Sequence, residues 1–219
     1  MIPSELLTET FGEGAKVLAI ETAFPQISLA LWSGEELLLP QTDLRTKRAA
    51  SLHEALRELL EKARIGPKDL SSILIDQGPG SYTGLRVGLA LAQTMEFTVG
   101  SKIHALYSTD LFAKRAAQHA QPGETFGVAL DARRKHWSYC LYRSDANTLQ
   151  RLGDPRCLPA PDLESFCMNL AFVAGPQEGI PVSCHQILLP TPKAADLFAS
   201  LPLSRIVQRV QPIYLMPPI

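Results

Sequence analysis

The residues in this sequence best suited to chemistry form a glycine-rich segment, Gly78 to Gly88, with the sequence GPGSYTGLRVG. Glycines let a backbone turn tightly and expose its N–H groups, which can then bind an anion such as phosphate. The segment is not a Walker loop, because no Lys-Ser or Lys-Thr follows, and its glycine spacing is not GxGxxG. The residues alone leave two interpretations, a phosphate-binding loop and a generic glycine-rich turn.

Acidic residues end two apolar runs of the chain, KVLAIE at Glu21 and VALD at Asp131. A carboxylate at the end of a strand can orient Mg²⁺ and water near nucleotide phosphates. Glu21 is one methylene longer than the aspartate that suits this task, and Asp131 can instead cap the turn at Ala132 and Arg133. We treat Glu21, Thr22 and Asp131 as the candidate remnant of a nucleotide site, and expect no catalytic residue.

The histidines do not have the spacing of a metal site. Two histidines one helical turn apart can hold one metal ion, but His53 is followed one turn on by Leu56 and Arg57. Arg57 also breaks the HExxH pattern that His53 and Glu54 would begin. The other four histidines are scattered along the chain. We expect no metal ligand, and interpret His53 as a hydrogen-bonding residue at the start of a helix.

Hydrophobic periodicity predicts the elements that position these residues. Helical spacing predicts one helix from Leu52, capped by Ser51 and ended by Gly66-Pro67, and a second from the glycine-rich segment to about Val99. A further helix begins at Ser108. Strands are expected where apolar residues run together or alternate, at residues 16–21, 27–32, 35–39, 72–76 and 102–106.

The second half of the chain opens as the first does, with an apolar run to Asp131, a turn, and an alternating strand from His136 to Tyr142. We interpret this as an internal duplication. Two such lobes are typical of the α/β actin-like ATPase and sugar-kinase (ASKHA) fold, with a mixed sheet and flanking helices in each lobe. We place the first lobe at residues 1–107 and the second at 108–219. The second lobe is reduced, because the proline-rich stretch after Arg143 leaves room for short strands and one helix near residues 194–201.

Composition excludes several classes of protein. The chain has 219 residues, of which 46% are hydrophobic, and a formal charge of −1. It can therefore bury a core, and nothing in its overall charge draws it to nucleic acid. The four cysteines have no CxxC spacing, and no secretory leader or membrane span is evident, so we expect a cytoplasmic protein with reduced thiols and no membrane partner. Two basic clusters, at residues 45–48 and 133–135, are interpreted as solvated loops that could contact RNA phosphates.

The segment GPGSYTGLRVG closely resembles GPGSFTGLRIG, the hallmark of the TsaB (YeaZ) family. VLAIETA resembles the opening ILAIDTS of that family, Ser51 to Glu54 lies where the family has a histidine-led helix, and VALDARRKHWSYCLY resembles AIDARRGEVYWALY. VAGPQEG and PIYLMPP resemble the later GDGA and PLYLR segments more loosely, so the resemblance is good over residues 16–143 and weak beyond. The residues that match the family's loop are Gly78, Pro79, Gly80, Ser81, Tyr82, Thr83, Gly84 and Arg86.

The resemblance implies an actin-like fold and a role in forming threonylcarbamoyladenosine (t6A) in tRNAs that read codons beginning with adenine. The protein would be a non-catalytic scaffold for the related catalytic subunit TsaD, together with the ATPase TsaE. It would require no cofactor of its own, while the complex uses ATP and Mg²⁺. The complex would contact tRNA, with or without direct contact from this chain, and the free protein would form a homodimer.

A stripe of small residues marks the second predicted helix, because Gly84, Gly88 and Ala92 recur every four residues. Glycine within a helix costs up to about 1 kcal/mol relative to alanine, which indicates a packing reason, either the protein's own sheet or another chain. The family's pairing through these helices favours an interface with TsaD or with a second copy. The residues expected there are Leu52, His53, Leu56, Leu59, Leu60, Gly84, Leu85, Gly88, Leu89, Ala92 and Met95.

Two other functions remain open at the level of sequence. A small actin-fold ATPase or kinase would use Glu21, the Gly78 to Gly84 loop and Asp131 on nucleotide phosphates. It would hydrolyse ATP alone with Mg²⁺, whereas a scaffold would stay inactive until TsaD and tRNA were added. A homodimeric binding module without a role in tRNA modification is the third interpretation.

Overall fold

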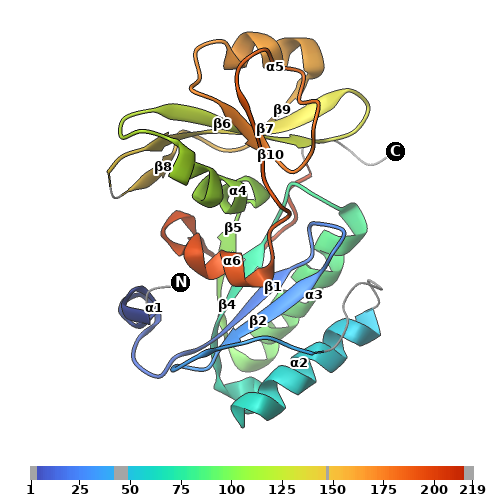
Figure 1. Cartoon of the computed structure of the whole chain (residues 1–219). Coiled ribbons are helices and arrows are strands. Elements are labelled where there is room, and N and C mark those ends of the chain that lie inside the picture. Colours follow the sequence, from blue (N-terminus) through green and yellow to red (C-terminus); the bar gives the residue numbers. More distant parts are fainter. Residues whose placement is uncertain (1–3, 42–48, 147, 215–219) are drawn as a thin grey trace. The chain divides into compact units, whose positions relative to one another are not determined.

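The computed structural model describes residues 4–41, 49–146 and 148–214. They divide into two compact units: the described residues up to 106 with 192–212, and the described residues of 107–191 with 213–214 (Figure 1). Residues 192–212 thus belong to the first unit, although the sequence placed them in a second lobe at 108–219. The physical reason is that this segment packs a helix and a strand onto the first sheet. Each unit is described by itself below.

The first unit holds a mixed sheet whose described strands lie in the order β12-β5-β4-β1-β2-β3. β1 is antiparallel to β2 and parallel to β4, and β4 is parallel to β5. All five predicted strands of this unit are present, but the third is reduced to two residues and β12 was not predicted. The strands are β1 (Lys16–Glu21), β2 (Ser28–Trp32), β3 (Leu37–Leu38), β4 (Leu70–Asp76), β5 (Lys102–Leu106) and β12 (Arg205–Val207).

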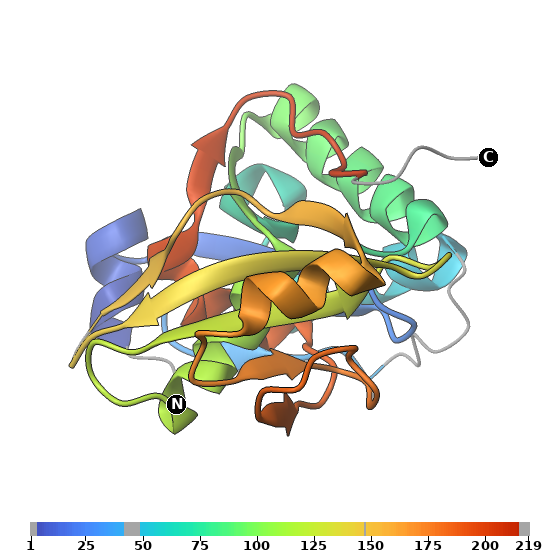
Figure 2. The ribbon, with the colours of Figure 1, turned by 90° about the horizontal axis from the view of Figure 1, so that it is seen from above.

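Helices cover the first sheet. α3 (Tyr82–Val99) packs on β1, β4 and β5, while α6 (Ala194–Ala199) packs on β1, β2 and β4. Figure 1 shows these two helices on opposite sides of the sheet, and Figure 2 shows the full length of α3 from another direction. α2 (Ala49–Ala63) packs on β2 and β3, and a short helix, α1 (Ser4–Phe11), precedes the sheet in the chain. The first sheet is therefore the middle layer of its unit.

The second unit holds a sheet whose described strands lie in the order β11-β10-β6-β7-β8, with β9 also paired to β7. The predicted hairpin is present as β6 and β7, paired antiparallel from Thr125 to Asp131. α4 (Ser108–Ala116) and α5 (Ala160–Cys167) pack on this sheet. Its strands are β6 (Thr125–Asp131), β7 (His136–Ser144), β8 (Leu149–Arg151), β9 (Arg156–Pro159), β10 (Val173–Gly175) and β11 (Gln186–Leu188).

Two sequence predictions about helices are wrong. α2 begins at Ala49, so Ser51 lies inside the helix and does not cap it. The two preceding alanines extend the helix, since alanine has the highest helix propensity. α5 is a second helix in the stretch expected to hold one, and Pro161 is accommodated because it lies in the first turn, where its missing N–H costs nothing.

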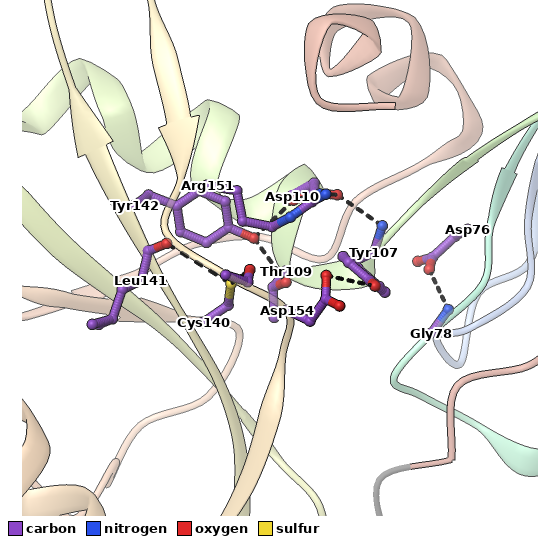
Figure 3. Close-up of polar contacts among 11 residues, drawn as sticks. Asp76, Gly78, Tyr107, Thr109, Asp110, Cys140, Leu141, Tyr142, Arg151 and Asp154 are labelled. Atoms are coloured by element: carbon purple, nitrogen blue, oxygen red, sulfur yellow. Dashed lines mark hydrogen bonds and ion pairs between the residues drawn. The ribbon is translucent and has the colours of Figure 1, made fainter. Parts of the chain in front are cut away.

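A buried carboxylate ties the second unit together (Figure 3). Asp110 of α4 is fully buried, and Arg151 of β8 donates to both of its oxygens at 2.9 and 2.8 Å. The Tyr142 hydroxyl donates to Asp110 at 2.8 Å, and the Tyr107 backbone N–H donates to it at 2.8 Å. Burial raises the pKa of Asp110, while Arg151 and the other donors oppose that rise. One acid thus joins a helix to two strands.

Replacing Arg151 with alanine should destabilise the protein by about 3–5 kcal/mol, because it leaves the Asp110 carboxylate buried without its cation. Since the pKa of Asp110 is already raised, the loss should shrink as the pH falls and the carboxyl binds a proton. Urea unfolding at pH 7 and pH 4.5 measures both effects. Arg143→Ala, at an exposed position on β7, is the matched control and should change stability by about 0.5 kcal/mol or less. Equal losses for the two variants would contradict this account.

Candidate functional site

Two carboxyl groups meet where β1 and β4 end. The parallel register pairs Ile20 with Ile75, so Glu21 and Asp76 follow at the same edge of the sheet. Glu21 Oε1 accepts the backbone N–H groups of Ala23, at 2.6 Å, and Phe24, at 3.4 Å. Asp76 Oδ1 accepts the N–H of Gly78 at 2.8 Å (Figure 3). Each acid therefore caps the turn that follows its own strand.

The environment of these acids favours the protonated form of Glu21. Both side chains are completely buried. Burial raises the pKa of Glu21 well above its ordinary value, and repulsion from Asp76 and a hydrogen bond with it raise that pKa further. The backbone N–H groups of Ala23 and Phe24 oppose the shift. We infer that the pair shares a proton, and a protonated Glu21 would be a poor Mg²⁺ ligand, because Mg²⁺ prefers ionised oxygens.

The glycine-rich segment forms the turn between β4 and α3, and its backbone is engaged within the unit. The Ser81 N–H donates to the Ala23 carbonyl at 2.7 Å, and the Ser81 side chain caps α3 by accepting the Gly84 N–H at 3.2 Å. A Cβ atom at Gly80 would lie 2.6 Å from the Ala23 carbonyl oxygen. The N–H groups of Gly78, Ser81, Gly84 and Leu85 are therefore used by the fold itself. The turn also fits closely against the residues that follow β1.

The glycines of α3 also face these residues. A Cβ atom at Gly84 would collide with the Thr22 carbonyl oxygen, and one at Gly88 would collide with the Thr22 side-chain oxygen. Both contacts would be closer than Cβ atoms make in real structures. Of the two packing reasons offered for the small-residue stripe, the structure shows the internal one. Glycine is needed at these positions because Thr22 occupies the space a side chain would take.

The other apolar residues proposed for the partner interface are likewise buried in this chain. The apolar stripe of α2 faces β2 and β3, and that of α3 faces β1, β4 and β5. His53 is exposed, as are Tyr82, Thr83 and Arg86 of the family's loop, with the Arg86 guanidinium 4.2 Å above the Tyr82 ring. The buried members are Leu52, Leu56, Leu59, Leu60, Gly84, Leu85, Gly88, Leu89, Ala92 and Met95.

Asp131, the third residue of the candidate nucleotide site, lies in the second unit, whereas Glu21 and Thr22 lie in the first. It is exposed, and its Oδ1 accepts the Arg133 N–H at 2.7 Å. This is the contact that the turn-capping interpretation predicts. Arg133, Arg134 and Lys135 follow with positive φ angles of 68°, 51° and 62°. The basic cluster at residues 45–48 lies outside the described residues.

Sequence reasoning missed Asp76, the partner of Glu21. The signal was present, since the strand SILID ends in an acid just as KVLAIE and VALD do.

No group of three or more His, Cys, Asp or Glu side chains with metal-binding geometry occurs in the described part of the chain. Within the same residues, no helix is both long and apolar enough to cross a bilayer.

Comparison with known proteins gives consistent matches. A family model described as TsaD, tRNA N6-adenosine threonylcarbamoyltransferase, matches residues 44–170. The tRNA threonylcarbamoyladenosine biosynthesis protein TsaB of Bacillus subtilis is 33% identical over 98 residues, 44% of this chain and 43% of that protein. The match to the protein of the same description in Escherichia coli is 22% identical and covers 91% of this chain and 94% of that protein. This chain thus matches less than half the length of the B. subtilis relative.

Solved structures agree with the fold. YeaZ from Pseudomonas aeruginosa superimposes with a TM-score of 0.71 at 22% identity, over 92% of this chain and all of that one. A crystal structure of an uncharacterized protein with similarity to peptidase YEAZ, also from P. aeruginosa, gives 0.75 at the same identity and coverage. These neighbours, together with the family match, confirm the predicted actin-like α/β fold.

The contact between Thr22 and α3 predicts a specific pattern of stability. Gly88→Ala should destabilise the protein by roughly 1–3 kcal/mol, because the new methyl group overpacks the Thr22 side chain. Thr22→Ala in the same molecule should recover part of this loss, since it removes the atoms that collide. Gly84→Ala should be as harmful but should gain nothing from Thr22→Ala, because it meets the Thr22 carbonyl oxygen. Urea unfolding of the two double-mutant cycles measures the difference, and equal coupling in both would refute this packing.

The shared proton predicts how stability depends on pH. Because the folded-state pKa of Glu21 is raised, its stabilising contribution is present below the unfolded pKa and is lost as pH rises through the folded pKa. Glu21→Gln mimics the protonated acid, so it should flatten the decline in melting temperature between pH 5 and pH 9. The control is Glu61→Gln, which makes the same change at an exposed position and should leave the slope of melting temperature against pH unchanged. A decline of the same slope in Glu21→Gln and the wild type would rule out the shared proton.

Proposed function

Because the chain belongs to the TsaD family of tRNA N6-adenosine threonylcarbamoyltransferase proteins, and among them to TsaB (YeaZ), we propose that it takes part in forming t6A in tRNA. In this proposal it is a non-catalytic partner subunit. It binds and supports a TsaD-type catalytic subunit, together with a TsaE-type ATPase. ATP and Mg²⁺ are used by the complex, and this subunit requires no cofactor.

The observation that carries the non-catalytic role is the internal use of the glycine-rich segment. A phosphate-binding version of this turn needs free N–H groups at the start of α3 and a free carboxylate at the end of β1. Here Ser81 accepts the Gly84 N–H, and Glu21 is buried against Asp76 while capping Ala23. The segment that would cradle a nucleotide instead fixes α3 onto β1. This supports a scaffold over the alternative ATPase or kinase.

The solvent-facing side of α3 is the partner surface we propose. From Val87 to Thr98 this side carries mostly small or apolar residues. Its polar member Gln93 donates to the Val210 carbonyl at 2.7 Å, and its charged member Glu96 accepts the backbone N–H of Arg209. The hydroxyls of Thr94 and Thr98 donate to carbonyls of their own helix at 2.7 and 2.6 Å. Such threonines present methyl groups to solvent, and Phe97 is 92% exposed. A surface of this kind suits packing against a helix of another subunit.

This proposal keeps α3 as part of the interface but changes the residues that make it. The buried stripe of Gly84 and Gly88 holds the helix in place, and the opposite side, with Ala90 and Phe97, meets TsaD. In the absence of TsaD the same side would meet a second copy, giving the homodimer. Any contact with tRNA phosphates would be made by the basic turn at residues 133–135 and would weaken with salt.

Depletion of the protein in its own cells tests the pathway. Mass spectrometry of digested tRNA should show loss of t6A, restored by a plasmid copy of the gene. The purified protein alone should show no t6A synthesis, and activity should require a TsaD-type subunit, a TsaE-type subunit, ATP and Mg²⁺. Unchanged t6A after depletion would refute the proposed function.

Ala90→Arg tests the partner surface. The position is exposed and helical, so the variant should fold with an unchanged melting temperature. It should bind a TsaD-type subunit at least about tenfold more weakly, because an arginine prevents close helix packing at the centre of the surface. Isothermal titration calorimetry measures the affinity. Ala146→Arg makes the same change at an exposed loop of the second unit and should bind as the wild type does; equal affinity for both variants would exclude this side of α3.

A further inference from the structure

Two thiols lie together in the second unit, in a part of the chain that the proposed function does not use. Cys167 is the last residue of α5, and Cys184 comes two residues before β11 begins at Gln186. Both line one surface cavity of about 450 Å³, together with Glu164, Met168, Asn169 and Ser183. Cys167 is 3% exposed, and Cys184 is partly exposed and packs against the same apolar cluster. Neither is bonded to another cysteine.

Hydrogen bonds hold the two segments side by side. The Glu164 carboxylate accepts the Ser183 backbone N–H at 2.8 Å and the Ser183 hydroxyl at 2.5 Å. Glu164 and Cys167 are three residues apart on α5 and therefore share one face of the helix. Beyond the cysteines, the Val173 N–H donates to the His185 carbonyl at 2.9 Å. Cys184 thus lies between Ser183, which is bonded to α5, and His185, which is bonded to the first residue of β10.

The electrostatics of the thiols are consistent with this proximity. Burial raises the pKa of Cys167 to about 12, and nearby Cys184 and Glu164 raise it as well. Burial also raises the pKa of Cys184, with a contribution from Glu164. Both thiols are therefore protonated at neutral pH and react slowly with weak oxidants.

We propose that Cys167 and Cys184 are a modification site, at which a hydroperoxide converts the two thiols into a reversible intramolecular disulfide. Cys184 is the residue that meets the oxidant, because it is the more exposed of the pair. Cys167, enclosed behind it, is the residue that resolves the product. The two thiols line the same cavity, and the bonds of Glu164 to Ser183 hold their two segments together, which places the thiols for an intramolecular disulfide. Because both thiols are protonated at neutral pH, we expect the bond to form slowly there and faster at higher pH.

The chemistry balances with hydrogen peroxide as the oxidant. The Cys184 thiolate attacks one peroxide oxygen, the O–O bond breaks, and the products are Cys184 sulfenic acid and hydroxide, which takes the proton lost by the thiol to form water. Cys167 sulfur then attacks the Cys184 sulfur, and the S–O bond breaks. The leaving oxygen takes the Cys167 proton and departs as a second water. Two thiols are oxidised by two electrons in all, and the peroxide is reduced to two waters.

A disulfide here would join the end of α5 to the segment that leads into β11. The closed loop spans residues 167–184, which include β10. Cross-linking reduces the freedom of the unfolded chain, so the oxidised protein should melt several degrees above the reduced protein. The bond would also narrow the cavity that the two thiols line.

Peroxide treatment of the purified full chain tests the proposal. The wild type should lose two of its four thiols, counted in denaturant with a chromogenic disulfide, and its mass should fall by that of two hydrogen atoms. A non-reducing peptide map should join Cys167 to Cys184, and dithiothreitol should restore both thiols. The rate should rise by about tenfold per pH unit below the thiol pKa, because the thiolate is the reacting species.

Single variants separate this pair from the other cysteines. The Cys184→Ser and Cys167→Ala variants should each form no intramolecular disulfide. If one of these variants fails to fold, the other is enough to test the proposal. Cys157→Ser, at a partly buried position on β9, is the matched control and should oxidise as the wild type does. A disulfide between any other residues, a cross-link between two copies, or oxidation to sulfinic acid without a disulfide overturns the proposal.

Discussion

The close contact between the turn after β1 and the first half of α3 is the constraint on which the first unit depends. Three glycines, at positions 80, 84 and 88, provide room for Thr22 and Ala23, and the N–H of Ser81 is bonded to the Ala23 carbonyl. This contact fixes where α3 lies on the sheet. It also determines which side of α3 remains available to solvent, and therefore which side a partner can bind. The glycine-rich segment, which could be taken for a phosphate-binding loop, thus allows α3 to pack closely against the turn after β1.

The two units stabilise buried acids in opposite ways. In the first unit, burial and repulsion from the neighbouring Asp76 raise the pKa of Glu21. In the second unit Asp110 has Arg151 as a counter-ion, which opposes the rise in pKa that burial causes. The Glu21–Asp76 pair is most stable when it keeps a proton, whereas the Asp110–Arg151 pair is most stable when both groups are charged. Rising pH should therefore weaken the first unit more than the second.

The strands and the long helices could be predicted from the sequence because each carries its own periodicity. The strand KVLAIE and the apolar face of α2 show this plainly. Periodicity indicates that a residue is buried but does not identify the atoms that cover it. From the sequence, the stripe of Gly84 and Gly88 could therefore pack against a partner subunit as readily as against Thr22. Short elements such as α5 and β12 have too few residues to show a period. The pairing of Glu21 with Asp76 depends on strand register, which joins residues far apart in the chain.

The return of residues 192–212 to the first unit has a consequence for synthesis on the ribosome. Leu197 and Phe198 of α6 are fully buried, and β12 covers the edge of β5, yet this segment is made after nearly all of the second unit. Until it emerges, the nascent first unit exposes an apolar sheet face and an unpaired strand edge, both of which promote association with other chains. The unit made first would thus be the last to be completed. A nascent chain arrested before residue 192 would be a natural substrate for chaperones.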